Sequence, residues 1–284
     1  MPSLVAGDVL VKVHAAGVNP LDWKIREGYM KAFSPLSFPY TMGQDFAGEI
    51  VEVGAAVTGF QKGERVFGFA QGADAEFATA KASAIAKVPE TVDDETAAAL
   101  PLAGLTAYQL IVDAVKADTS TTILIHGAAG GVGSIAVQIA KHRGARVLAN
   151  ASQKDAEYLG TLGVDRVIAH EQDRFDQVVT GVDAVIDLVG GDTLERSFGV
   201  VKKGGVLVST VAKVDETKLQ QSGIAGRMLI TQRDGQELEA LVDLVARRIV
   251  KPKVSQIMPL AEAKAAEDMS QQGKAHGKIV LKVD

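Results

Sequence analysis

The sequence predicts an α/β protein in which a doubly wound parallel sheet accompanies a small β-barrel or strongly bent sheet. From about residue 121 onward, strand-like and helix-like segments alternate, as in parallel sheets with helices on both faces. Residues 1–93 instead carry short β-like runs separated by Gly, Pro and Asp. A length of 284 residues suits about two domains, each with its own core.

The composition restricts the classes of function. With 47% hydrophobic and 23% charged residues, the chain is typical of a soluble globular protein. A net charge of −5 offers no general attraction to nucleic acid or to anionic membranes. No apolar run approaches the length of a membrane span and the amino end lacks a secretory signal, so we expect a cytoplasmic protein. The absence of Cys excludes disulfides, thiolate nucleophiles and Cys-ligated metals.

The expected elements follow from these patterns. In the barrel-like part we expect strands at 9–14, 47–53 and 65–69. An alanine-rich helix with acids in its first turn starts near residue 92, breaks near Pro101 and resumes over 106–115. The parallel part then predicts strands at 121–126, 145–151, 165–169, 182–189, 205–211 and 228–232, with helices at 134–143, 154–162 and 193–201. A helix at 236–250, a short helix ending near 271 and a strand at 277–283 complete the chain.

The glycine-rich stretch after the strand at 121–126 carries the main functional signal. It matches G-x-G-x-x-G with Ala at the first glycine position, through Ala128, Ala129, Gly130, Gly131, Val132 and Gly133. Glycines there let a pyrophosphate approach the N–H groups and the positive dipole end of the next helix. We therefore predict that Ala129 to Gly133 bind a dinucleotide; an ordinary glycine-rich turn is the alternative.

The end of the following strand bears on the choice between NADH and NADPH. An NAD site usually places a carboxylate on the ribose 2′-hydroxyl about 20 residues after the glycine loop. The stretch 150–154 reads N-A-S-Q-K and contains no acid. The hydroxyl of Ser152 and the ammonium of Lys154 suit a 2′-phosphate, so we predict NADPH. An N-cap serine and a solvated lysine are the alternative.

Several motifs, taken in order, resemble one family. They are G-V-N-P-L-D-W-K (17–24), G-Q-D-F-A-G-E-I-V-E-V-G (43–54), G-E-R-V-F-G (63–68), L-P-L-A-G-L-T-A-Y (100–108), A-A-G-G-V-G (128–133) and H-G-K-I-V-L (276–281). Together they resemble the zinc-independent quinone oxidoreductase branch of the medium-chain dehydrogenase/reductases. The resemblance implies a GroES-like β-barrel catalytic domain at 1–93 and 251–284, a Rossmann NADPH-binding domain at 94–250, and a homodimer. Relatives generally begin with about two further strands, so we expect a naturally short amino end, a misassigned start or a truncated chain.

The resemblance also assigns roles to single residues. Asn19, Gln44 and Leu102 stand where zinc-dependent relatives carry ligands, and none of these residue types suits zinc, so we predict no catalytic metal. By resemblance Thr106 lies near the nicotinamide, and Val189 and Gly190 pass beneath the cofactor. A hydroxyl bonded within its own helix and a simple glycine turn are the alternatives. His170, where relatives commonly have Tyr, contacts the adenosine phosphate or is a surface histidine.

Catalysis without a metal needs a donor for the acceptor oxygen and a source of a proton. Asn19 is the expected donor, with an Asn-Pro turn as the alternative. Tyr29 or Tyr40 is the expected proton donor, with packing roles, or delivery by water, as alternatives. The predicted function is NADPH-dependent hydride transfer to a small-molecule quinone or to the activated C=C bond of an α,β-unsaturated carbonyl. A polyketide-type enoyl reductase, and an NADPH-binding sensor or crystallin-like protein with decayed catalysis, are the alternatives.

Overall fold

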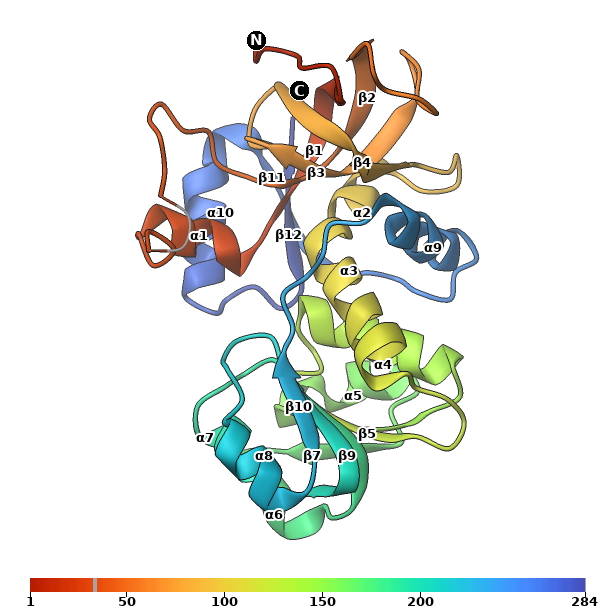
Figure 1. Cartoon of the computed structure of the whole chain (residues 1–284), viewed down its shortest axis with the longest axis vertical. Helices are drawn as coiled ribbons and strands as arrows, with labels where there is room; N and C mark the ends of the chain where they lie inside the picture. Colours follow the sequence, from red (N-terminus) through yellow and green to blue (C-terminus); the bar gives the residue numbers. More distant parts are fainter. Residues whose placement is uncertain (33–34, 284) are drawn as a thin grey trace. The chain divides into compact units, whose positions relative to one another are not determined.

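A computed structural model describes residues 1–32 and 35–283, and these form two compact units. Unit 1 comprises Met1–Leu105, Gln232–Arg248 and Pro252–Asp284, and unit 2 comprises Thr106–Thr231 with Ile249–Lys251. The resemblance stated above predicts domain boundaries at 93/94 and 250/251. The units divide the chain elsewhere because helix α9 (Gly235–Ala246) packs against strand β4 (Phe77–Lys87) of unit 1, as Figure 1 shows.

Unit 1 is built on a six-stranded sheet that closes on itself. Its order is β11-β12-β1-β2-β3-β4, and β1 also pairs with β4, which closes the first four strands into a barrel. All pairs are antiparallel except β11 with β12. The remaining strands are β1 (Asp8–Val18), β2 (Asp45–Val53), β3 (Arg65–Gln71), β11 (Val254–Pro259) and β12 (Lys278–Lys282). The predicted strands at 9–14, 47–53, 65–69 and 277–283 all lie on this sheet.

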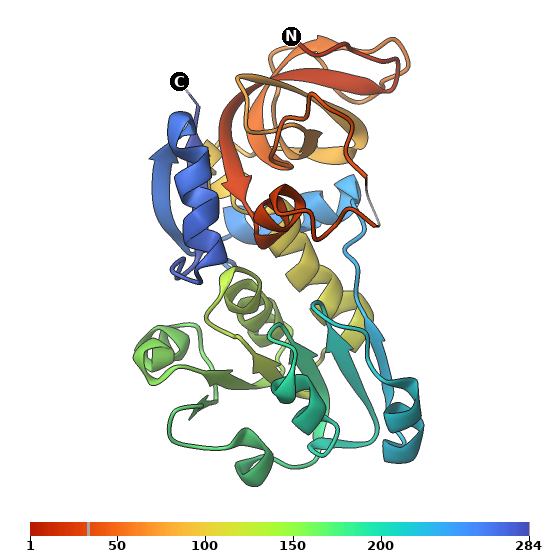
Figure 2. The ribbon, with the colours of Figure 1, turned by 90° about the vertical axis from the view of Figure 1, so that its left-hand side faces the viewer.

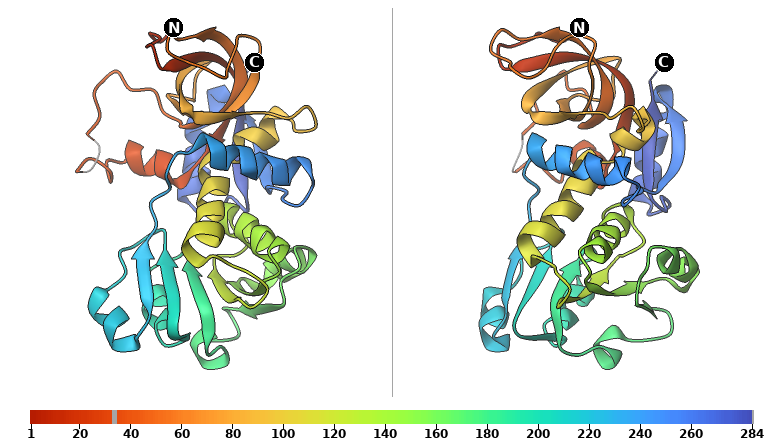
Figure 3. Two further views of the ribbon diagram at one scale, coloured as in Figure 1. Left: turned by 45° about the vertical axis from the view of Figure 1, so that its right-hand side comes forward. Right: turned by 90° about the vertical axis from the view of Figure 1, so that its right-hand side faces the viewer.

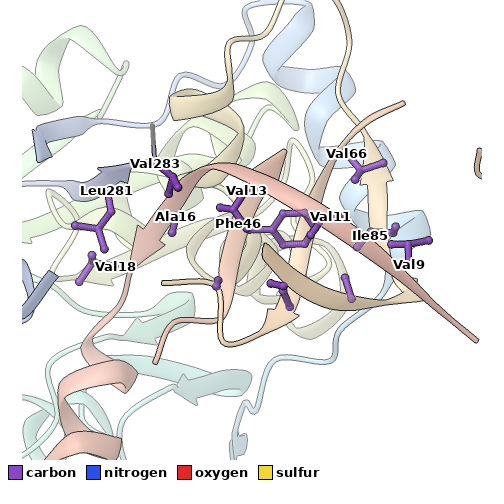
Figure 4. Close-up of a cluster of buried hydrophobic side chains, with 14 of the residues drawn as sticks. Val9, Val11, Val13, Ala16, Val18, Phe46, Val66, Ile85, Leu281 and Val283 are labelled. Carbon is purple, nitrogen blue, oxygen red and sulfur yellow. The ribbon is translucent and has the colours of Figure 1, made fainter. Parts of the chain in front are cut away.

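The barrel core consists of alternate apolar residues of these strands. Phe46, Val11 and Val13 are buried together with Ile85 and Leu281, and Figure 4 shows these side chains gathered inside the sheet. Fully burying an aliphatic or aromatic side chain contributes roughly 1.5–3 kcal/mol each. Because β12 supplies Leu281, the carboxyl end of the chain completes a core that the first strands begin.

Short helices cover the rest of unit 1. They are α1 (Pro20–Arg26), α2 (Asp94–Ala98), the 3-10 turn Leu260–Glu262 and α10 (Ala263–Gln271), while α3 (Pro101–Tyr108) runs across the division after Leu105. Figure 2 shows α1 beside α10, and the Arg26 guanidinium donates to Glu267 at 2.9 Å across that contact. The sequence did not predict α1, although Pro20 at its first position is a standard start.

Unit 2 contains a sheet that is parallel throughout. Its order is β10-β9-β8-β5-β6-β7, so the chain winds to one side from β5 and to the other from β8. The strands are β5 (Thr122–His126), β6 (Arg146–Ala151), β7 (Arg166–Ala169), β8 (Val182–Asp187), β9 (Val201–Ser209) and β10 (Ala225–Met228), the last three side by side in Figure 3. The predicted doubly wound α/β class is confirmed, and the switch point lies between β5 and β8.

The connections of unit 2 are mostly helical. They are the π-helical segment Gln109–Val115, α4 (Gly131–His142), the 3-10 turn Gln153–Asp155, α5 (Ala156–Thr161), α6 (Phe175–Val178), α7 (Asp192–Ser197) and α8 (Glu216–Ser222). The strand expected at 228–232 lies instead at Ala225–Met228, and α8 before it was not expected. In the described part of the chain, no helix is long and apolar enough to cross a membrane.

Candidate functional site

The glycine loop of unit 2 joins β5 to α4 and leaves no room for a Cβ atom at Gly133 and little at Gly130. A Cβ atom on Gly133 would lie 2.3 Å from the Gly127 carbonyl oxygen and 2.7 Å from the Ala128 Cα, and one on Gly130 would lie 3.3 Å from the same oxygen. Gly130 is the N-cap residue of α4, whose first N–H groups have no partners within the helix. The loop therefore offers backbone donors and a helix dipole to an anion, in a form that a pyrophosphate fits.

A second loop reaches the same edge of the sheet from β8. A Cβ atom on Gly127 would lie 3.4 Å from Val189 Cγ2, so the loops after β5 and β8 are neighbours at the switch point. Buried Asp187 shapes this second loop, because its Oδ1 accepts from the N–H groups of Val189 at 3.1 Å and Gly190 at 2.9 Å. Its Oδ2 accepts from the Ser209 hydroxyl at 2.7 Å. The predicted residues Val189 and Gly190 thus lie beside the glycine loop.

The end of β6 holds the predicted 2′-phosphate residues together with an acid. The His170 N–H donates to the Ala151 carbonyl at 3.1 Å, which brings Ser152 next to the residues that follow β7. The Ser152 hydroxyl donates to the Glu171 carboxylate, and it makes no capping bond to the turn that it precedes. Glu171 also accepts from the Gln153 N–H at 3.1 Å and contacts His170 Nδ1 at 3.0 Å. Lys154 is exposed.

Two further residues of unit 2, Thr106 and His126, make hydrogen bonds to other side chains of the same unit. Thr106 Oγ1 lies 2.5 Å from Thr231 Oγ1, so its hydroxyl bonds outside its own helix. His126 is fully buried, and its ring nitrogens contact Asn150 and Ser197, each at 3.0 Å. Since the Asn150 amide nitrogen can only donate, and the Ser197 hydroxyl donates to the Thr193 carbonyl, His126 Nδ1 is the acceptor and Nε2 carries the proton. Burial lowers the pKa of His126 to about 4, which keeps the ring neutral.

In unit 1 the predicted donor Asn19 is buried in a cluster of charges. Only 2% of its surface is exposed. Its amide oxygen accepts a hydrogen bond from the buried Lys278 ammonium, and its backbone N–H donates to Asp22 at 2.7 Å. The amide nitrogen makes a long contact of 3.4 Å to the Gly17 carbonyl. Lys278 therefore fixes the orientation of the amide, whose NH₂ group contacts the Gly17 carbonyl and Asp45.

The zinc-ligand positions of the related enzymes meet around Asp45. Asp45 Oδ2 accepts from the Leu102 N–H at 3.1 Å and lies 3.7 Å from Lys278 Nζ. Gln44, the next residue, accepts a hydrogen bond from the Arg233 guanidinium. Among the residues that the structure describes, no group of three His, Cys, Asp or Glu side chains is arranged to hold a metal. Amide and aliphatic side chains at these positions do not fit zinc.

The predicted proton donors differ in their surroundings. Tyr40 is half-buried, and burial together with the nearby Asp22 charge raises its pKa, while Arg233 opposes the shift. Its phenol is therefore protonated at neutral pH. Tyr29 is 69% exposed and stacks edge-on against Trp23, with ring centroids 6.0 Å apart. Only Tyr40 borders the buried charges.

Those charges shift the pKa values of the carboxyl groups in the cluster. Burial raises the pKa of Asp22 well above its usual range. Burial also raises the pKa of Asp45, although Lys278 pulls it back, and burial lowers the pKa of Lys278 itself. Burial, with the charges of Glu267 and Asp45, raises the pKa of Asp74 to about 7. The cluster therefore contains groups that hold protons near neutral pH.

Sequence reasoning missed Glu171, Asp187 and Lys278. Glu171 was not predicted because an acid was expected only at the end of β6, whereas Glu171 follows the neighbouring strand β7. Asp187 is the last residue of a buried strand, which is a usable signal for a polar group at the ligand edge. Lys278 begins the final strand directly before the apolar residues Ile279 to Leu281, and a lysine that is buried in this way needs a partner.

Comparisons with known proteins agree with this arrangement. Residues 5–90 match the family described as alcohol dehydrogenase GroES-like domain, and residues 162–281 match the one described as zinc-binding dehydrogenase. A quinone oxidoreductase of Rattus norvegicus is 32% identical over 300 aligned positions, which cover 99% of this chain and 91% of the relative. A 2-methylene-furan-3-one reductase of Solanum lycopersicum is 33% identical over 296 positions, covering 99% of this chain and 73% of the relative.

A solved structure gives the same result for the fold. A mycobacterial protein crystallised in complex with NADPH is similar with a TM-score of 0.89 and 33% identity, covering 99% of this chain and 93% of that one. The similarity thus extends over both units and over the motifs at both ends of the chain. The chain belongs to the medium-chain dehydrogenase/reductase superfamily of oxidoreductases, in its zinc-independent quinone oxidoreductase branch.

Proposed function

We propose that this protein is an NADPH-dependent oxidoreductase that transfers hydride, without zinc, to a quinone or to the activated C=C bond of an α,β-unsaturated carbonyl. The observation that carries the proposal is the meeting of the glycine loop and the Val189–Gly190 loop at the switch point of the parallel sheet. The relatives support it, because they include a quinone oxidoreductase and a 2-methylene-furan-3-one reductase, and a similar structure was solved with NADPH.

The cofactor site follows from the residues of unit 2. The first N–H groups of α4, at Gly131, Val132 and Gly133, would hold the pyrophosphate, with Ala129 and Gly130 beside it. Ser152, Lys154 and His170 would bind the 2′-phosphate. Val189, Gly190 and Thr106, whose hydroxyl bonds Thr231, would support the nicotinamide end. When bound, the nicotinamide supplies the hydride.

The acceptor side follows from the residues of unit 1. With its oxygen bonded to Lys278, Asn19 would donate to the acceptor oxygen, where charge develops during reduction, from an NH₂ group that in this structure contacts the Gly17 carbonyl and Asp45. Tyr40, protonated at neutral pH, gives the proton that completes reduction of an alkene or quinone. Tyr29 is the second candidate donor, and its exposure makes it a partner of solvent. Asp74, whose pKa burial raises to about 7, lies within the same cluster.

The first test is consumption of NADPH by the purified protein, with NADH as the control cofactor. A naphthoquinone is offered in one assay and a small enone in the other, and the preferred acceptor decides between the two reactions. We expect turnover with NADPH. Bound NADPH without turnover on either acceptor would contradict the enzymatic proposal and favour a binding protein. We further propose a cytoplasmic homodimer, whose mass light scattering measures.

Two matched substitutions connect the activity with the glycine loop. Gly133→Ala forces a Cβ atom against the Gly127 carbonyl, so NADPH binding should weaken by at least about tenfold, or 1.4 kcal/mol. Gly160→Ala, in α5 of the same unit, adds the same methyl group where no atom lies within 4 Å. It should bind NADPH as the parent protein does. Equal binding by both variants would reject the role of the loop.

A further inference from the structure

The carboxylate of Glu171 is the centre of a small group of hydrogen-bond donors. One oxygen accepts from the Ser152 hydroxyl, and the other accepts from the Gln153 N–H at 3.1 Å and lies 3.0 Å from His170 Nδ1. The side chain contacts of Ser152 hold the pKa of Glu171 below its usual range, so the group is an anion at neutral pH. The donors are therefore arranged around a negative charge.

We propose that Glu171 is a specificity-determining residue that competes with the 2′-phosphate of NADPH for the donors of Ser152, Gln153 and His170. This inference rests on the proposed function, because it requires the adenosine end of the cofactor to lie at the end of β6. A phosphate at that place needs the same donors that the carboxylate already occupies. The same carboxylate can accept a hydrogen bond from a free ribose 2′-hydroxyl.

The competition for donors and the hydrogen bond to a free 2′-hydroxyl both shift the relative affinity from NADPH towards NADH. NADPH binds only when the Glu171 side chain leaves its donors, and the two anions repel each other at short range. The side chain has room to leave, since 47% of it is exposed. NADH carries no such anion and gains a hydrogen-bond acceptor. Glu171 therefore reduces the preference for NADPH that Ser152 and Lys154 create.

Calorimetric binding of two nucleotides tests the proposal without any turnover. Adenosine 2′,5′-bisphosphate carries the 2′-phosphate, and adenosine 5′-monophosphate is the same molecule without it. In Glu171→Gln we expect the bisphosphate to bind about tenfold more tightly, the scale of one charge-assisted hydrogen bond. Binding of the monophosphate should stay the same or weaken. Glu171→Ala, which removes the acceptor as well, should show the same gain for the bisphosphate.

Asp173→Asn is the matched control, because it removes the same charge two residues further along the exposed loop. It should change neither affinity. An equal gain in Asp173→Asn would show a general charge effect and overturn the proposal, as would an unchanged or weaker affinity of both Glu171 variants for the bisphosphate. If the parent protein binds neither nucleotide, the cofactor site itself is wrong and this proposal falls with it. If the parent protein binds both nucleotides and neither Glu171 variant binds the bisphosphate more tightly, the cofactor site stands and only this proposal is rejected.

Discussion

Replacing Asp74 with Asn should stabilise the protein at pH 8 and leave its stability nearly unchanged at pH 4. The Oδ1 atom of Asp74 is buried and has no hydrogen-bond partner in the described part of the chain. Burial first, and then the charges of Glu267 and Asp45, raise its pKa from 3.8 to about 7. The folded protein thus holds a proton that the unfolded chain releases across this range.

The sign and size of the effect follow from proton linkage. Between pH 4 and 7 the folded state binds more protons than the unfolded state, so the free energy of unfolding falls as the pH rises. Each pH unit is worth about 1.4 kcal/mol, so the carboxylate costs the folded state about 4 kcal/mol by pH 8 relative to pH 4. Asn has the same shape and does not titrate. The stability difference between Asp74→Asn and the parent should therefore grow by about that amount.

Urea unfolding at several pH values measures this difference. The protein contains one Trp, Trp23, which lies in unit 1 with Asp74, so its fluorescence reports the unfolding of that unit. Glu90→Gln is the control, because it removes a carboxylate from an exposed position of the same unit. Its stability difference should not change with pH. A flat profile for Asp74→Asn would refute the argument that Asp74 is desolvated.

Two further predictions concern unit 2. Lys154→Ala should weaken NADPH binding by about fivefold, a modest factor because the side chain is exposed, and should leave NADH unchanged; equal losses in fluorescence titrations would reject the assignment. His126 has a folded pKa of about 4 against 6.5 as the reference value. Its stabilising contribution is therefore complete above pH 6.5 and falls by about 3 kcal/mol towards pH 4. His126→Gln should show a shallower loss of stability in that range by circular dichroism, and parallel profiles would contradict the assignment.

Local patterns were sufficient for the parallel sheet and for the glycine loop. The alternation of strand and helix segments predicts β5 to β9 because each strand is buried and each helix shows one apolar face. The loop was recognisable because Gly130, Gly131 and Gly133 lie close together directly after a strand-like run. The short strand β10 was predicted a few residues too far along the chain. Its four residues are mostly exposed, so they show no apolar periodicity that would fix its limits.

The candidate sites were harder to predict because they depend on distant pairings. Glu171 meets Ser152 only because β6 and β7 are neighbours, and Lys278 meets Asn19 only because the last strand pairs with the first. Neither pairing leaves a trace in local composition. Asn19, Tyr29 and Tyr40 could be selected as candidates from the sequence. The burial of Asn19 and the exposure of Tyr29 could not be predicted from it. The roles assigned to them stay predictions.

The charges of unit 1 give a physical reason for the amide residues at the zinc-ligand positions. The oxygen of Asn19 already accepts from the Lys278 ammonium, and that of Gln44 accepts from the Arg233 guanidinium. A divalent cation on those oxygens would face two positive charges at short range, and burial strengthens the repulsion from Lys278, whereas Arg233 is exposed. The same two cations leave both NH₂ groups as the donating ends of the amides. Asp45, 3.7 Å from the Lys278 ammonium, partly balances the charge of this buried lysine.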